Sequence, residues 1–122
     1  MFLQHSRIVL IVAVDPVVAA LLGLLGEFAG EAPQFPAPGE VPADAIRRVR
    51  AAVVFLDCHH DVACEDHAYA AADEVGSEVL LFAHERERHH LERMAAARNA
   101  HALRLPIHPH QLASRVSEVL AA

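Results

Sequence analysis

The sequence predicts an α/β fold: a doubly wound sheet of five parallel strands with helices on both faces. Three apolar runs of strand length, at residues 7–14, 52–57 and 78–83, support this class. Strands that helices cover on both faces are apolar throughout, whereas half-exposed strands alternate. Helical patterns separate the runs, and such alternation implies right-handed crossovers and a parallel sheet. Asp57 ends the middle run abruptly, at the edge where open α/β sheets place their functional sites.

The N-terminal apolar stretch predicts a strand followed by a helix. Asp15 can cap a helix and Pro16 suits its first position, so we expect a helix over 16–29 that ends at Gly30. The helical spacing of its apolar residues predicts an inner face made of Val17, Leu21, Leu24, Leu25 and Phe28. Residues 8–26 have the length of a membrane span, but Asp15-Pro16 interrupts them, so we expect no membrane segment.

The segment between this helix and the central strand is the least regular part of the chain. Residues 31–42 carry four prolines, which remove sheet hydrogen-bond donors, so we expect only a weak edge strand near Gln34-Phe35, or a loop. Residues 43–50 predict a short helix whose inward side chains are Ala45, Ile46 and Val49. The central strand then runs over 52–57.

The second half of the chain repeats the strand–helix pattern. We expect a helix over 63–75 closed by Gly76, a strand over 78–83, and a helix over 85–100 with Asn99 as a left-handed cap. A short strand at 102–105 and a helix over 109–120 complete the order. The expected inward residues of the last two helices are Leu91, Met94, Ala95, Leu112, Val116, Val119 and Leu120.

Length and composition predict a single cytoplasmic domain. The chain of 122 residues suffices for one self-contained core, which we place within 6–121, and its apolar share of 54% excludes disorder. A net charge of -6 without a basic run argues against direct nucleic-acid binding. Two cysteines, Cys58 and Cys64, are too few for a disulfide framework and favour cytosolic thiols.

Four segments together resemble the receiver domain of two-component response regulators, a flavodoxin-like fold. Residues 8–16 resemble its first strand and acidic turn, and residues 39–57 the approach to the phosphoacceptor aspartate. Residues 79–83 resemble the fourth strand, and residues 105–112 the Lys-Pro turn and the start of the last helix. The resemblance covers about residues 7–120. It implies that Asp57 is equivalent to the phosphoacceptor and that the Leu105-Pro106 peptide is cis.

The resemblance also implies chemistry that this sequence lacks. A receiver uses two acids after the first strand to hold Mg²⁺, and a hydroxyl residue and a lysine to grip the phosphoryl oxygens. Here Ala13 and Val14 occupy the acid positions, and only the neighbouring Asp15 remains. Ala83 stands in place of the hydroxyl residue and Leu105 in place of the lysine. We therefore expect that Mg²⁺ binding is lost and that the chain is a pseudo-receiver without enzyme activity.

A pseudo-receiver needs another way to signal, and we expect it to bind proteins. In receivers the surface of the fourth helix, fifth strand and fifth helix contacts partners and also forms dimers. The resemblance therefore implies other signalling proteins, or a second copy of this chain, as the partner. The residues that would form this surface here are Arg86, His89, His90, Arg93, Arg104, His108 and Arg115.

Two alternative functions stay open at this point. In the first, Asp57 is phosphorylated with the help of an unusual metal site. In the second, the residues from Cys58 to His67 form a metal or redox sensor, because His60, Cys64 and His67 fall at i, i+4 and i+7. A polar loop without metal is the simpler interpretation, since this spacing matches no zinc-ribbon pattern. Ten histidines could also sense pH, but no bistable element is evident.

Overall fold

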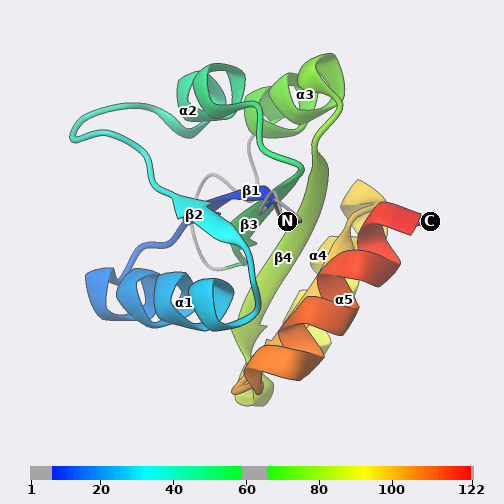
Figure 1. Cartoon of the computed structure of the whole chain (residues 1–122). Coiled ribbons are helices and arrows are strands. Elements are labelled where there is room, and N and C mark those ends of the chain that lie inside the picture. Colours follow the sequence, from blue (N-terminus) through cyan, green and yellow to red (C-terminus); the bar gives the residue numbers. More distant parts are fainter. Residues whose placement is uncertain (1–6, 59–65, 122) are drawn as a thin grey trace.

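The structure, a computed structural model of the chain, describes residues 7–58 and 66–121. Strands and helices alternate along this part of the chain (Figure 1). The strands are β1 (Ile8–Val12), β2 (Ala32–Gln34), β3 (Val53–Asp57), β4 (Glu78–His84) and β5 (His101–Leu105). The helices are α1 (Pro16–Phe28), α2 (Pro42–Val49), α3 (Asp66–Val75), the short 3₁₀ turn η2 (Glu85–Glu87), α4 (Arg88–Arg98) and α5 (Pro109–Ala121). The predicted start of α3 at residue 63 lies outside the described residues.

The five strands form one parallel sheet in the order β2-β1-β3-β4-β5. β3 is its centre, with Val54 paired to Leu10 of β1 on one side and to Val79 of β4 on the other. The strand order reverses between β1 and β3, which is where doubly wound folds form a crevice. The predicted fold class is confirmed, and so is the weakness of the second strand, which has three residues and lies at an edge.

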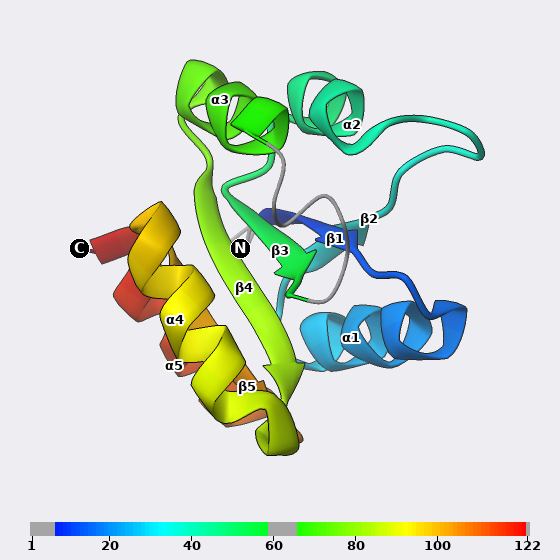
Figure 2. The same ribbon diagram turned by 180° about the vertical axis from the view of Figure 1, so that it is seen from behind.

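Helices cover both faces of the sheet, and the two faces have separate cores. α1 and α5 cover one face, where Phe55 of β3 and Phe82 of β4 are buried with Leu112 of α5 (Figure 1). α2, α3 and α4 cover the opposite face, where Leu56 and Leu81 are buried (Figure 2). Neighbouring residues of one strand therefore enter different cores, which explains why the central strands are apolar throughout.

The inner face predicted for α1 is wrong. Of the five residues expected there, only Leu25 packs against the core. The other four are 64%, 55%, 51% and 71% exposed, in the order Val17, Leu21, Leu24 and Phe28. The side chain that enters the core is Leu22, which is 1% exposed.

A close contact between Gly23 and Phe35 accompanies this rotation of α1. Gly23 is buried, and a Cβ atom placed on it would lie 2.8 Å from Cζ of Phe35. The glycine side of the helix therefore receives the Phe35 ring, which follows β2. Leu22 and Leu24 lie about 100° from Gly23 in opposite directions, and Leu22 is the one that packs on the sheet.

The remaining inward predictions fit the structure with one exception. Ala45 and Ile46 of α2, Leu91 and Ala95 of α4, and Leu112, Val116 and Val119 of α5 are all buried. Leu120 is 36% exposed, so its assignment to the core is wrong. It follows Val119 by one position, which turns it about 100° around the helix and away from the buried side of α5.

Several chain turns follow from single residues, as the sequence indicates. Asp15 caps α1, since its Oδ1 accepts a hydrogen bond of 2.9 Å from the Val17 amide. Asn99 ends α4 with a φ of 53°, in the left-handed region that asparagine tolerates well. The Leu105-Pro106 peptide is cis, as the resemblance implies.

The apolar stretch of residues 8–26 divides at Asp15-Pro16, as predicted. Its first part forms β1 at the interior of the sheet, and its second part forms α1, which has 13 residues. Among the helices of the described residues, none combines the length and the apolar character that crossing a membrane requires.

Candidate functional site

The carboxyl end of β3 opens into a cavity of about 320 Å³ that contains the Asp57 side chain. It lies where β1, β3, β4 and β5 end and α1 begins. Its walls are mostly apolar and are contributed by Val14, Asp15, Val18, Asp57, Phe82, Ala83, His84 and Leu105. Around Asp57 the fold therefore brings together four of the positions to which the resemblance points, namely Val14, Asp15, Ala83 and Leu105.

Asp57 is half-buried and faces the turn after β1. One of its carboxylate oxygens, Oδ2, accepts a hydrogen bond of 3.2 Å from the backbone amide of Val14. A backbone amide is a neutral donor that cannot compensate a second negative charge brought to the same carboxylate.

Asp15 lines the same cavity, but its carboxylate serves the helix. Its Oδ1 accepts the Val17 amide at 2.9 Å, which satisfies one of the free donors at the start of α1. The side chain is otherwise exposed to solvent. This second acid of the cavity is thus a structural cap in this chain.

The three remaining positions contribute no polar group to the site. Ala83 is 4% exposed and Leu105 is half-buried beside it in the cavity wall. Ala13 does not line this cavity. It lines a separate one of about 500 Å³, between the end of β1 and the loop that connects β2 to α2.

The described residues do not fit a Mg²⁺ ion of the kind that receiver folds hold. Mg²⁺ requires an octahedral set of oxygen ligands at short distance. The cavity offers the carboxylates of Asp57 and Asp15, of which the second caps α1, and its other described walls are apolar apart from His84, which is not an oxygen ligand. Within residues 7–58 and 66–121, no three histidine, cysteine, aspartate or glutamate side chains come together as a metal site.

The alternative cluster from Cys58 to His67 is only partly described. His60 and Cys64 lie outside the described residues. His67 is exposed near the start of α3. Cys58 is 2% exposed and belongs to the core between the sheet and helices α2, α3 and α4. A buried thiol among apolar side chains has low reactivity, so the described position of Cys58 is that of a core residue. The redox alternative stays a prediction.

The predicted partner surface lies over η2, α4, β5 and the start of α5. Arg86, His89, Arg93, Arg104 and His108 are exposed, whereas His90 and Arg115 are half-buried. Its charges are mixed, because Glu85 lies 3.7 Å from Arg88 and 4.0 Å from Arg104.

Arg115 has a structural role that the sequence does not reveal. Its Nε and Nη2 donate to the backbone carbonyl of Ala102 in β5, at 3.1 and 3.0 Å, and its Nη1 pairs with Glu118 at 3.1 Å. It therefore ties α5 to the edge strand. A groove of about 450 Å³ runs beside it on this surface, lined by Glu85, Ala102, Leu103, Arg104, Pro106, Ile107, Gln111 and Arg115.

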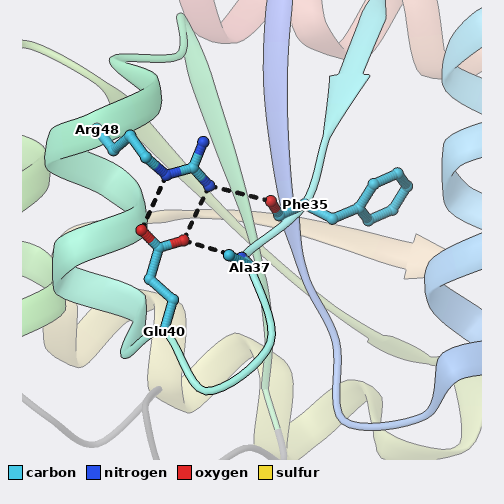
Figure 3. A network of polar contacts seen from close by, with 4 residues as sticks. All are labelled: Phe35, Ala37, Glu40 and Arg48. Atoms are coloured by element: carbon cyan, nitrogen blue, oxygen red, sulfur yellow. Dashed lines mark hydrogen bonds and ion pairs between the residues drawn. The ribbon is translucent and has the colours of Figure 1, made fainter.

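A polar network also fixes the loop between β2 and α2 (Figure 3). Arg48 of α2 donates to both carboxylate oxygens of Glu40, each at 2.8 Å, and to the Phe35 carbonyl at 3.3 Å. Glu40 also accepts the Ala37 amide at 2.9 Å. The hydrogen bond from Arg48 is the main cause that lowers the pKa of Glu40 from 4.5 to about 2. Sequence reasoning missed this network, because an acid and an arginine eight residues apart match neither the i,i+3 nor the i,i+4 spacing that pairs side chains on a helix.

Comparison with known proteins identifies solved structures with the same architecture. No model of a protein family matches the sequence, and no curated protein matches it. The response regulator receiver protein of Burkholderia phymatum superposes with a TM-score of 0.75 at 18% identity, over 95% of this chain and 96% of that one. Chemotaxis protein CheY4 of Vibrio cholerae gives 0.71 at 18% identity, over 95% and 100%. The receiver domain of a sensor histidine kinase from Pseudomonas aeruginosa, solved with a magnesium ion in its active site cleft, gives 0.71 at 14% identity, over 97% and 100%.

The chain is therefore a doubly wound, flavodoxin-like α/β protein. Within that class, its fold is that of the receiver domains of response regulators, as the four sequence segments indicate. At these identities the likeness establishes the fold, and the chemistry of the site follows from this chain's own side chains.

Proposed function

We propose that this chain is a pseudo-receiver: a regulatory domain that binds proteins and does not depend on a phosphoryl group. The observation that carries the proposal is the composition of the cavity around Asp57. Its carboxylate meets the Val14 amide, and the adjoining wall positions are Val14, Ala83 and Leu105. The setting is bacterial signal transduction or transcriptional regulation in the cytoplasm, because the superposed receivers are signalling proteins.

Electrostatics supports independence from phosphorylation. Phosphoryl transfer to a carboxylate brings negative charge to negative charge, and receivers and kinases offset it with a metal ion and cationic side chains. A unit charge pair at 4 Å interacts by about 4 kcal/mol at the effective dielectric constant of a protein surface. Among the described residues that line this cavity there is no lysine or arginine. The described walls therefore hold no permanent positive charge to offset the repulsion, which supports a domain that does not catalyse its own phosphorylation.

Protein binding is supported by the surface over η2, α4, β5 and α5. Arg86, His89 and Arg93 are exposed there, and Arg86 and Arg93 form no ion pair with the described residues. The neighbouring groove of about 450 Å³ offers a concave seat for a partner side chain. The partner is another signalling protein, and Arg86 and Arg93 are available to pair with its acidic groups.

Incubation with Mg²⁺ and a small phosphodonor, or with beryllofluoride, tests the proposal. We expect no added phosphoryl mass and no shifts in the backbone amide signals of Asp57, Ala83 and Leu105. The Asp57→Asn variant is the matched control, because it removes the acceptor and keeps the shape of the side chain. Phosphoryl uptake in the native chain that is absent from Asp57→Asn would place the protein among phosphorylatable receivers.

A further inference from the structure

The outer surface of α1 carries a row of exposed apolar side chains. We name it the α1 stripe: Val14, Val17, Leu21, Leu24 and Phe28, which are 58%, 64%, 55%, 51% and 71% exposed. Successive members are three or four residues apart, so from Val17 onward they share one side of the helix. In Figure 1, α1 lies at the outside of the fold.

The stripe is distinct from the surface that holds α1 on the sheet. The core contacts of α1 come from Val18, Leu22 and Leu25, with Leu22 1% exposed. Each stripe residue from Val17 to Leu24 precedes one of these by one position, which turns it by about 100° from the core side. The core therefore does not need the stripe, and a surface helix normally carries polar residues there.

Charge is almost absent from this helix. Of the 13 residues of α1 only Glu27 is charged, and neither the first nor the last turn carries a basic side chain. α4 differs in this respect, since Arg88, Glu92, Arg93 and Arg98 all belong to it. A surface of this kind suits an equally apolar partner surface and no charged one.

The spacing of the stripe makes it complementary to itself. From Val17 to Phe28 the steps are four, three and four residues, the same in both directions along the chain. In an antiparallel pair of α1 helices, Leu21 then faces Leu24 of the second copy, and Val17 faces Phe28. This matching is what a two-fold symmetric interface requires. The step pattern also matches the heptad seam of paired helices.

The single charge of the helix does not oppose such a pair. In the same antiparallel register Glu27 of one copy faces Val18 of the other, nine residues from the second Glu27 along the axis. At 1.5 Å per residue the two carboxylates are about 13 Å apart, beyond the Debye length of about 8 Å at physiological salt. A parallel pair would bring the two carboxylates to the same level.

The exposed area reaches the range that a dimer needs. The five side chains are each more than half exposed, which corresponds to about 500 Å² of apolar surface per copy for residues of this size. Complete burial of both stripes would remove at most about 1,000 Å², which is the size of a weak and reversible specific interface. We propose that two copies of this chain associate through their α1 stripes, antiparallel and with two-fold symmetry.

Sedimentation analysis of the full chain over a range of concentrations tests the association. We expect a monomer–dimer equilibrium that Leu24→Glu weakens by about 10- to 100-fold, since burial of a leucine contributes about 1.5–3 kcal/mol. Arg93→Glu, on the surface of α4, is the matched control and should leave the equilibrium unchanged. A chain that stays monomeric at the highest concentration overturns the proposal. So does a dimer that Arg93→Glu dissociates and Leu24→Glu does not.

A crosslinking experiment tests the register without relying on loss of binding. In a Cys64→Ser background, a mixture of the Leu21→Cys and Leu24→Cys variants should form disulfide-linked dimers faster than either variant alone. Faster crosslinking of the single variants would overturn the antiparallel arrangement. Both experiments are independent of Mg²⁺ and phosphodonors, so their outcome does not depend on whether Asp57 accepts a phosphoryl group.

Discussion

Helices α1 and α4 pack on opposite faces of one sheet, and the side chains on their outer sides differ in polarity. Each buries one leucine: Leu22 of α1 is 1% exposed and Leu91 of α4 is 0% exposed. On its outer side α4 presents arginine, histidine and glutamate side chains, whereas α1 presents the stripe. Both helices pack on the sheet through buried side chains, so packing on the sheet does not account for the apolar outer side of α1. This difference is the reason for proposing an association through the α1 stripe.

The largest expected effect is a loss of stability when the buried leucine of either helix is shortened. Leu22→Ala and Leu91→Ala should each lower the free energy of unfolding by about 2–5 kcal/mol, through lost burial and the cavity left behind. Urea denaturation at a low protein concentration measures this. Leu24→Ala is the control and should cost less than about 1 kcal/mol in the monomer, since Leu24 is 51% exposed. An equal loss in Leu24→Ala would contradict the assignment of the two sides of α1.

Two glycines of α1 sharpen the comparison within one helix. Gly26→Ala should raise the free energy of unfolding by about 0.5–1 kcal/mol, because alanine is the better helix former and nothing lies within 4 Å of the new Cβ. Gly23→Ala should gain less or lose stability, since its Cβ would lie 2.8 Å from the Phe35 ring and displace it. Thermal unfolding of both variants gives the order. Equal stabilisation would contradict the close packing of Phe35 against Gly23.

Acid should weaken two ion pairs, both on helices that cover the face of the sheet opposite α1. Arg48 of α2 lowers the pKa of Glu40 from 4.5 to about 2, and Arg98 of α4 lowers the pKa of Asp66 of α3 through its hydrogen bond. A lowered pKa means that the stabilisation is complete above the ordinary pKa and is lost as the pH falls through the lowered one. For Glu40 this loss spans about pH 4.5 to 2.

Denaturation at a series of acid pH values measures how the free energy of unfolding declines as these ion pairs are lost. Glu40→Gln should flatten the decline in stability over that range, because the folded and unfolded states then bind the same number of protons at this position. Glu92→Gln, an exposed acid on α4, is the control and should leave the decline as it is. An unchanged decline in Glu40→Gln would remove the network around Arg48 as a source of acid sensitivity.

The smallest effect concerns the two outer sides in the monomer. Leu21→Gln on α1 and Arg93→Gln on α4 should each change the free energy of unfolding by less than about 0.5 kcal/mol, because both side chains are exposed. Hydrogen exchange of dilute protein provides the measurement. A marked loss in Leu21→Gln would mean that the stripe belongs to the core of the monomer.

The sequence predicts the fold more reliably than the rotation of α1, for a physical reason. Apolar residues surround this helix so widely that the row with Leu21 and Leu24 and the row with Leu22 and Leu25 have the same period. Periodicity cannot choose between them. In the structure Leu22 packs on the sheet while Gly23 faces Phe35, and both contacts join residues that are distant in the sequence.

The sequence likewise predicts one part of the candidate site and not another. The apolar run that ends at Asp57 indicates where the site lies, and the turn after β1 and the ends of β4 and β5 follow from the strand order. What the sequence does not disclose is that Ala13 lines a different cavity from Val14. Successive residues after a strand point in different directions, and the turn geometry decides which one faces Asp57.

The short β2 strand affects how molecules of this protein associate at high concentration. Its three residues include Pro33, which has no amide hydrogen to offer to an additional strand, and Pro36 and Pro38 follow closely. At the other margin, β5 carries Arg104 and is succeeded by Pro106. Neither edge strand of the sheet therefore pairs readily with a strand of another molecule, so growth into fibrils is disfavoured. We expect contacts between molecules to use helical surfaces and to give discrete, reversible complexes.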